Sequence, residues 1–427
     1  MQSVYKIKNS LMNGEYDNLF HNTLCCDASI AVKRTLDVLD GFVRSFEDEE
    51  CALFSSPGRT ELGGNHTDHQ GGAVLAAAVN MDMLCAASKT DNNFVCIEAE
   101  RFGRISVDLS TNKPIAAERG TSAALVRGVA SWFEERGYKI SGINAYVVSD
   151  VPPGSGMSSS ASFEVLIGTI FNSFFAENAF SKVDIAKAGL YAENIYFGKP
   201  CGLMDQIACA VGGIVSIDFS DSIEPKVQSM NADFNKNGYS LCLISTGGDH
   251  TDLTSEYADI TNEMKEISCF FGKEKLSEIN EKDVVGNFAK LRDLCGDRAV
   301  LRAINYFEED RRAKKMADVL LANDINAYLK LVNMSGNGSF MYLQNIYPSG
   351  SKKMQPVAVA LKAAELSLAG EGAVRVHGGG FAGTIQAYVP NVMLNEFISN
   401  MEEFLYPGCC SVLKVRKVGA VKIEVGN

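Results

Sequence analysis

A stretch rich in glycine and serine, from Val151 to Glu164, is the feature that most constrains this chain. It follows a run at 143–148 whose β-branched and apolar residues are typical of a strand, and it precedes an apolar run at 161–175 that is typical of a buried helix. The stretch therefore ends at a helix N-terminus, where backbone N–H groups lack partners within the helix. Its glycines let the backbone approach a ligand, its serines offer hydroxyl groups, and the helix dipole favours an anion. This combination predicts a phosphate-binding loop.

The loop differs from the nucleotide-binding pattern that contains Gly-Lys-Ser/Thr, because no lysine follows its second glycine, Gly156. The residues alone leave one alternative open, a serine-capped turn between a strand and a core helix that binds nothing. The length of the glycine and serine run favours the phosphate loop over this turn.

A second polar stretch, residues 55–72, follows a short predicted strand at 52–54. It contains two histidines, two acidic residues, one arginine and five glycines. We predict a loop on which polar side chains converge on a hydroxylated ligand, because carboxylates accept hydrogen bonds from hydroxyl groups and histidine can donate or accept. The alternative is a solvated turn that carries a few charges.

Three further stretches contain candidate site residues. A predicted helix at 183–197 carries Glu193 shortly before Asp205 in the sequence. Asp205 either has a functional role or occupies the N-terminus of a helix, where the dipole favours an acid. Tyr257 stands near the start of another predicted helix. A glycine-rich run, residues 375–384, lies between two short predicted strands and on its own is a weak indication of a site.

In this order, the stretches resemble the motifs of the GHMP small-molecule kinases in their galactokinase form. Residues 152–161 resemble the phosphate loop of that family, Pro-x-Gly-x-Gly-Leu-Ser-Ser-Ser-Ala, with Met157 in place of leucine. Residues 200–206 match its Pro-Cys-Gly-x-Met-Asp-Gln stretch, and residues 378–383 resemble its third motif, Gly-Gly-Gly-Phe-Gly-Gly. The resemblance covers roughly residues 50–390.

The resemblance implies an α+β, two-domain GHMP kinase fold with the active site in the cleft between the domains. The N-terminal domain, residues 1–225, would be ribosomal-protein-S5-domain-2-like. The C-terminal domain, residues 226–427, would be a ferredoxin-like α/β sandwich. We place the boundary in the polar segment at 220–238.

The resemblance also assigns roles to residues. Asp205 would be the catalytic base, and Arg59 would face the reacting hydroxyl and the transferred phosphate. The other residues implied for the site are, for the ATP phosphates, Pro153, Gly154, Ser155, Gly156, Met157, Ser158, Ser159 and Ser160; for magnesium, Ser160 and Glu193; for the sugar, Asn65, His66, Asp68, Gly202 and Tyr257; and for the third glycine motif, Gly378, Gly379 and Gly380. The implied cofactors are ATP and Mg²⁺, and the implied reaction converts a sugar, with galactose preferred, to its α-1-phosphate.

The sugar signature departs from the family pattern, Gly-Arg-x-Asn-Leu-Ile-Gly-Glu-His-Thr-Asp-Tyr, at Glu61, Gly63, Asn65 and His69. Asn65 stands where the family has a glutamate that would accept from the C6 hydroxyl, so a negative charge is removed and a donor is added. Residues 69–72, His-Gln-Gly-Gly, also resemble galacturonate-directed members of the family.

These departures leave the sugar open. Galacturonate or another galacto-configured sugar is one alternative to galactose, although Asp249 stands where a basic residue is common and a carboxylate substrate would prefer a cation. A non-catalytic sugar sensor is the other alternative. The complete serine run and Asp205 argue against the sensor.

Composition limits the partners and the location of the chain. With 427 residues it is long enough for two domains, and a net charge of −12 argues against nucleic acid as a partner. We expect small-molecule partners, the sugar and ATP, and a monomer or weak dimer. No run approaches the length of a membrane span and the N-terminus has no apolar signal core, so we expect a cytoplasmic protein with free thiols.

Two local predictions can be compared with the structure. A helix is expected from Ala28 to Phe46, capped by Asp27, because apolar residues recur there at helical spacing. The run Ser335-Gly336-Asn337-Gly338-Ser339 is expected to form a turn.

Overall fold

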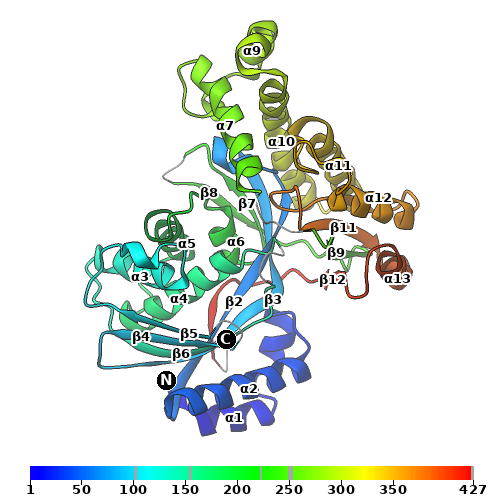
Figure 1. The fold of residues 1–427 in the computed structure, drawn as a ribbon. Helices are drawn as coiled ribbons and strands as arrows, with labels where there is room; N and C mark the ends of the chain where they lie inside the picture. The colour runs from blue at the N-terminus through cyan, green and yellow to red at the C-terminus, as the bar shows by residue number, and fades with distance from the viewer. Residues whose placement is uncertain (101–102, 153–155, 222–223, 249–252, 425–427) are drawn as a thin grey trace.

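The computed structural model describes residues 1–100, 103–152, 156–221, 224–248 and 253–424. Four of the residues considered above, Pro153, Gly154, Ser155 and Asp249, lie outside these ranges. The described residues form two sheets with helices packed around them (Figure 1).

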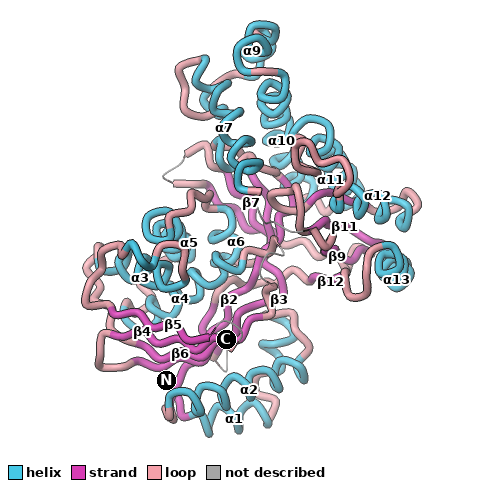
Figure 2. The backbone as a smooth tube through the Cα atoms, viewed as in Figure 1, coloured by secondary structure: helices cyan, strands magenta, loops and turns pink. Residues whose placement is uncertain are grey.

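The larger sheet has nine strands among the described residues and is built on a long pair, β2 (Glu50–Gly63) and β3 (Ala73–Lys89). The order β1-β2-β3-β6-β4-β5 runs across one half of the sheet, while β7 pairs with the first part of β3, β8 pairs with β7, and β13 pairs with β2. The other strands are β1 (Gln2–Ser3), β4 (Phe94–Ala99), β5 (Gly103–Asp108), β6 (Ile143–Ser149), β7 (Ile214–Asp218), β8 (Lys226–Met230) and β13 (Val421–Ile423). Figure 2 shows the long strands running through the middle of the molecule, from the part near α2 to the part near α7, so this pair reaches both halves.

Helices cover both faces of the larger sheet (Figure 1). One face is covered by α3 (Ser122–Glu134), α4 (Ser159–Phe175), α5 (Lys182–Tyr191) and α6 (Met204–Val211). The other face is covered by α1 (Val4–Met12) and α2 (Ala28–Phe46). The predicted helix at 28–46 is confirmed, and the Asp27 side chain accepts hydrogen bonds from the Ser29 and Ile30 N–H groups at its start.

The smaller sheet has the order β10-β11-β9-β12 and lies beside a group of helices. Its strands are β9 (Tyr239–Ser245), β10 (Ala373–Val376), β11 (Thr384–Pro390) and β12 (Cys410–Leu413). The helices of this part are α7 (Thr254–Phe270), α8 (Glu281–Gly286), α9 (Phe288–Cys295), α10 (Asp297–Leu321), α11 (Ile325–Gly338), α12 (Pro356–Leu368) and α13 (Leu394–Phe404). The α+β architecture expected from the sequence is therefore present.

The division at residue 225/226 stays a prediction, but the path of the chain qualifies it. Strand β8 still belongs to the larger sheet, and β13 returns to it from the far end of the chain. Just before β13, the buried Arg416 donates to the Ser55 hydroxyl at 2.7 Å and to the Asp82 carboxylate at 3.0 Å. Asp82 also pairs with Arg34 of α2, so a buried carboxylate ties α2 and the segment before β13 to the same sheet.

The loop predicted for residues 55–72 is partly wrong, because β2 continues to Gly63. Arg59, Thr60 and Glu61 pair with Ala78, Ala77 and Ala76 of β3. These alanines are fully buried, and their small side chains leave space beside the large polar residues of β2. Hydrogen bonding along the strand therefore continues through a segment whose composition is typical of a loop.

The turn predicted at 335–339 is also wrong, since helix α11 runs to Gly338. Its glycines serve close packing. A β-carbon on Gly336 would lie 3.0 Å from the Val374 carbonyl oxygen, and one on Gly338 would lie 2.7 Å from the Asn305 side-chain oxygen. The neighbouring elements approach this helix more closely than any larger residue would allow.

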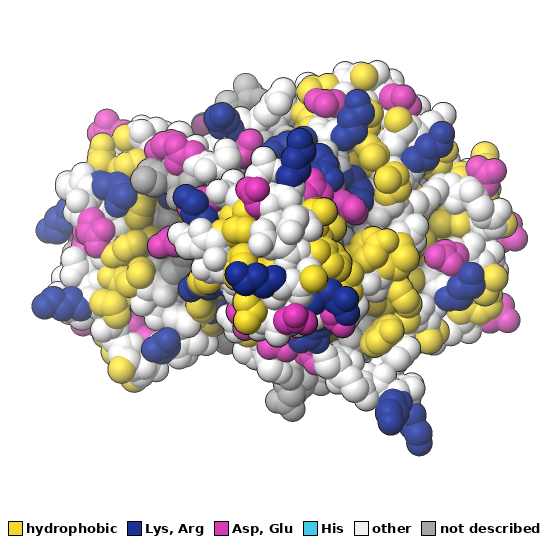
Figure 3. All heavy atoms as spheres, turned by 90° about the horizontal axis from the view of Figure 1, so that it is seen from above, with side chains coloured by type: hydrophobic (Ala, Val, Ile, Leu, Met, Phe, Trp, Pro, Cys, Tyr) yellow, Lys and Arg dark blue, Asp and Glu magenta, His cyan; other side chains and the backbone are white. Residues whose placement is uncertain are grey.

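Among the helices that the structure describes, none has the length and the apolar character needed to cross a bilayer. On the face shown in Figure 3, basic and acidic side chains are interspersed.

Gly41 of α2 provides a test of how this helix packs on the sheet. A β-carbon at this position would overlap the ring of Tyr146 on β6. We expect Gly41→Ala to lower the free energy of unfolding by about 1–3 kcal/mol through overpacking, measured by urea denaturation.

Gly286→Ala is the matched control, because Gly286 ends helix α8 with nothing within 4 Å of the added carbon. That variant should keep the parent's stability or gain up to about 1 kcal/mol from helix propensity. Equal effects of the two substitutions would contradict the packing of α2 against Tyr146.

Candidate active site

The end of the predicted phosphate loop is anchored against β2. The backbone N–H of Arg59 donates to the Met157 carbonyl at 3.1 Å, and the Met157 side chain is buried in the core. Gly156 and Ser158 both adopt left-handed backbone conformations, with φ of +74° and +54°, before α4 begins at Ser159. Such a conformation is costly for a serine and is held here by its surroundings.

Ser158 does not cap helix α4; instead, its hydroxyl donates to the carboxylate of Asp205. The same carboxylate forms a bidentate ion pair with Arg59, whose Nε and Nη2 lie 2.6 and 2.7 Å from the two carboxylate oxygens. Arg59 also donates through Nη1 to the Gly156 carbonyl. Three predicted site residues from three separate stretches are thus joined at the N-terminus of α4.

The protonation state of Asp205 follows from this geometry. Burial acts to raise the pKa of Asp205, but the charge and hydrogen bonds of Arg59 and the Ser158 hydroxyl outweigh it, so the pKa lies below its ordinary value. Asp205 also occupies the first turn of α6, where the helix dipole favours a negative charge. Asp205 is therefore an ionised carboxylate at neutral pH, able to accept a proton or a hydrogen bond.

Glu193 lies in a π-helical turn, Ala192–Phe197, that continues α5. Its carboxylate accepts from the side-chain amide of Gln206 at 3.0 Å, and the same amide donates to Glu164 of α4 at 3.0 Å. Lys199 lies 3.3 Å from the other oxygen of Glu193. One amide thus holds two buried carboxylates, and burial followed by the Glu193 charge raises the pKa of Glu164 well above its ordinary value.

These residues fit a magnesium ion of the kind that is shared with nucleotide phosphates. Ser160 precedes Glu164 by one helical turn, so both lie on the face of α4 that looks toward Glu193 and Gln206. Mg²⁺ commonly takes one or two protein oxygens and completes its shell with phosphates and water. In the described part of the chain no cluster of three or more His, Cys, Asp or Glu side chains could hold a metal by itself.

The third glycine motif offers its backbone carbonyls to the residues predicted to bind sugar. The Gly378 carbonyl accepts from the Asn65 amide at 2.7 Å, the Gly379 carbonyl lies 3.0 Å from Nε2 of His66, and the Gly380 carbonyl accepts from the Tyr257 hydroxyl at 3.0 Å. Each of these carbonyls therefore contacts a different side chain of the predicted sugar-binding set.

The bond to the Gly379 carbonyl fixes the tautomer of His66. A carbonyl oxygen only accepts, so Nε2 carries the proton and Nδ1 is left as an acceptor. Burial lowers the pKa of His66 to about 4, so the ring is neutral at pH 7. His66 also has a left-handed backbone, with φ of +61°, which is uncommon for a residue other than glycine.

Asp68 and Gly202 lie next to each other. A β-carbon on Gly202 would overlap the Asp68 carboxylate, so a larger residue there would have to displace that carboxylate. Gly202 precedes Asp205 by three residues at the start of α6. Asp68 therefore lies close to the N-terminus of α6, the helix that carries the predicted base Asp205.

Sequence reasoning missed several residues that hold these parts together. His377 accepts through Nε2 from the Glu61 N–H at 3.3 Å and donates through Nδ1 to the Thr384 hydroxyl at 3.0 Å. Its ring also faces Gly156, where an added β-carbon would lie 3.0 Å from Nδ1. Arg375 pairs with Glu61. Both His377 and Arg375 belong to the glycine-rich run at 375–384, but nothing in that run indicates their partners.

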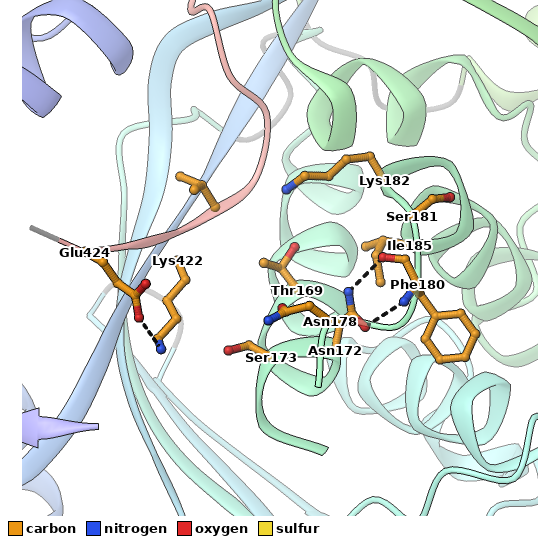
Figure 4. A pocket seen from close by; sticks show the side chains of 11 residues that line it. Thr169, Asn172, Ser173, Asn178, Phe180, Ser181, Lys182, Ile185, Lys422 and Glu424 are labelled. Carbon is orange, nitrogen blue, oxygen red and sulfur yellow. Dashed lines mark hydrogen bonds and ion pairs between the residues drawn. The ribbon is translucent and has the colours of Figure 1, made fainter. Parts of the chain in front are cut away.

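A pocket of about 550 Å³ lies elsewhere, between the C-terminal end of α4, the start of α5 and strand β13 (Figure 4). Its two lysines are already engaged, since Lys182 donates to the Ala420 carbonyl and Lys422 pairs with Glu424. None of the predicted site residues lines it.

Two family models match parts of the chain. Residues 40–89 match the galactokinase galactose-binding signature, and residues 124–213 match the N-terminal domain of GHMP kinases. Galactokinase of Lacticaseibacillus casei is 27% identical over 371 residues, which cover 86% of this chain and 92% of that protein. Galactokinase of Clostridium perfringens is 28% identical over 381 residues, covering 84% and 91%.

Solved structures share the fold. The crystal structure of Lactococcus lactis galactokinase complexed with galactose superposes with a TM-score of 0.78 at 23% identity, covering 91% of this chain and 100% of that chain. A mevalonate kinase structure gives a TM-score of 0.60 at 14% identity, covering 86% and 99%. The two-domain α+β fold expected from the sequence is therefore that of the GHMP kinases.

The buried His377 predicts a pH dependence of stability. Burial, followed by the charges of Arg59 and Arg375, lowers the pKa of His377 well below its ordinary value of 6.5. Below pH 6.5 the unfolded chain therefore binds more protons than the folded protein, so stability falls as the pH is lowered. We expect His377→Gln to lose less unfolding free energy than the parent between pH 7.5 and pH 5.5, by about 1 kcal/mol, in urea denaturation.

Comparing each protein with itself at the two pH values cancels the constant cost of the substitution. A parallel loss in both proteins would show that His377 takes up its proton in the folded state.

Proposed function

Since the chain belongs to the GHMP kinase superfamily and carries the galactokinase signature, we propose that it is an ATP-dependent galactokinase. It would transfer the γ-phosphoryl group of ATP to the C1 hydroxyl of galactose and release ADP and α-galactose 1-phosphate. The observation that carries the proposal is the Arg59–Asp205 pair, which lies at the N-terminus of α4 beside the phosphate loop and close to the sugar signature.

The chemical problem is that a sugar hydroxyl is a poor nucleophile at neutral pH, so transfer requires in-line placement and neutralisation of charge. The N-terminus of α4 and the loop before it would hold the phosphates, because their N–H groups and the helix dipole favour an anion. The proposed sugar side is built around the predicted set Asn65, His66, Asp68, Gly202 and Tyr257, with Nδ1 of His66 as the group that would accept from a ring hydroxyl.

Asp205 would accept the proton of the C1 hydroxyl. Its low pKa makes it a weak base, which suits a loose phosphoryl-transfer transition state in which the proton leaves late. Arg59 is already hydrogen-bonded to both oxygens of Asp205 and would share its charge between that carboxylate and the transferred phosphoryl group. Mg²⁺ on Ser160 and Glu193, when bound, would neutralise part of the phosphate charge.

The test of the proposed reaction is ATP-dependent, magnesium-dependent release of ADP with galactose, galacturonate, N-acetylgalactosamine and arabinose. We expect the highest kcat/KM with galactose and no turnover without magnesium. Turnover confined to another of these sugars would transfer the proposal to that sugar, and binding of galactose without turnover on any of them would make the protein a sensor.

Asp205→Asn tests the proposed base. The amide keeps the size of the side chain but cannot accept the proton, so we expect kcat to fall about 10²- to 10⁴-fold. Nucleotide binding, measured by calorimetry with ADP, should be retained because the phosphate loop is unchanged. The matched control is Asp27→Asn, at a helix N-cap where asparagine is as favourable as aspartate.

The control should keep the parent's kcat. An Asp205→Asn protein that folds like the parent and turns over at the parent's rate would remove Asp205 from the mechanism.

A further inference from the structure

Glu61 and Asn65 are two of the positions at which the sugar signature departs from the family pattern, and in the structure they contact each other. The Asn65 amide nitrogen lies 3.1 and 3.3 Å from the two carboxylate oxygens of Glu61. Both residues are buried, with exposed fractions of 3% for Glu61 and 2% for Asn65. An acid and an amide thus share one enclosed space.

Arg375 of β10 supplies the positive charge that pairs with Glu61. Its Nη2 donates to the Glu61 carboxylate, and its Nε donates to the Val376 carbonyl at 3.1 Å. Burial raises the pKa of Glu61, and the charges of Arg375 and Arg59 and the Asn65 amide oppose the increase. Because both groups bonded to its carboxyl are donors, their hydrogen bonds favour the ionised form of Glu61.

The hydrogen-bonding capacity of Asn65 is fully used inside the protein. Its two N–H groups serve Glu61 and the Gly378 carbonyl, and its oxygen accepts from the Asn345 amide at 2.8 Å. The orientation is fixed as well, because a flipped amide would turn its oxygen toward two acceptors. A sugar hydroxyl would therefore have to displace a buried partner to reach this side chain.

The effect on the site passes through the glycine motif. Gly378, held by Asn65, precedes Gly379, whose carbonyl fixes the tautomer of His66. The Asn345 amide also donates to the Gly379 carbonyl, at 3.1 Å. Asn65 thus holds the Gly378 carbonyl, and Asn345 holds the next carbonyl, that of Gly379, which His66 contacts.

We propose that Glu61, Asn65 and Arg375 form a positioning unit that holds the third glycine motif against the sugar signature, so that Asn65 acts on the sugar through His66 and does not contact it. This inference rests on the proposed function in assigning His66 to the sugar. It moves the specificity for the C6 group away from residue 65, although the sequence alone predicted a contact there.

The unit requires one acid and one amide at positions 61 and 65. A carboxylate at residue 65 would lie beside that of Glu61, with Arg375 as the one cation in direct contact with the pair among the described residues, and it would face the Gly378 carbonyl without a proton to donate. The requirement predicts that the two positions are energetically coupled.

The experiment is a double-mutant cycle with isosteric substitutions, Asn65→Asp, Glu61→Gln and the two combined. We expect Asn65→Asp alone to raise the KM for the sugar about tenfold or more, and to raise it much less in the Glu61→Gln background. The reason is that the amide introduced by Glu61→Gln has no charge to repel the new carboxylate and can donate a hydrogen bond to it. The KM for ATP should stay within about twofold of the parent, which general destabilisation would not produce selectively.

Asn280→Asp is the matched control, since Asn280 caps helix α8 at an exposed position where aspartate serves equally well. It should leave both KM values unchanged. Independent effects of the two substitutions on the sugar KM, equal in both backgrounds, would overturn the positioning unit and assign Asn65 a direct contact with the sugar.

The same cycle is measured by thermal unfolding without ligand, so it does not depend on the reaction. Asn65→Asp should lower Tm more in the parent background than in the Glu61→Gln background. If the parent phosphorylates none of the sugars tested, the proposed function fails, and this unfolding cycle still decides whether the three side chains act as a unit: additive shifts in Tm would overturn it.

Discussion

Two opposite charges on one face of strand β2 organise the centre of this protein. Arg59 and Glu61 are two residues apart, so their side chains leave the strand on the same face, and both are buried. A buried charge is tolerable only when it is paired, and each finds its partner far along the chain, Arg59 at Asp205 and Glu61 at Arg375. One pairing holds helix α6, and the other holds strand β10 of the smaller sheet. The requirement to pair both charges therefore brings the two halves of the molecule to the same place.

The glycine motifs contribute mainly through their main chain. In the run Gly378, Gly379 and Gly380, three consecutive carbonyls receive Asn65, His66 and Tyr257. A side chain on Gly379 would meet the Tyr257 ring at 2.6 Å, so the tyrosine can approach only because that side chain is missing. The motif is thus a row of acceptors that side chains from both halves can reach.

Local features were predictable from the sequence. The helix at 28–46 and its Asp27 cap were readable because apolar spacing and capping chemistry are contained in neighbouring residues. The helix that follows the phosphate loop was predicted from the apolar run at 161–175, although α4 begins two residues earlier, at Ser159 within the serine run. The extension of β2 through Arg59 was not readable, because it depends on the small alanines of β3, and the glycines of α11 were misinterpreted because their reason lies in Val374 and Asn305. The same limit explains Asn65, whose position was found but whose partners at 61, 345 and 378 come from contacts that no local pattern specifies.

The return of β13 to the larger sheet affects how the chain folds during synthesis. Strand β2 lies between β3 and β13 in its lower part, and Arg416 satisfies the buried Asp82 carboxylate together with Arg34. When only the first half of the chain has emerged from the ribosome, β13, which pairs with β2, and Arg416, one of the two arginines at Asp82, have not yet been synthesised. Until the last residues emerge, the open edge of β2 and a partly neutralised aspartate remain exposed to other proteins. The first half must wait for the end of the chain, so protection of nascent chains should matter more here than in a protein whose sheets close in order.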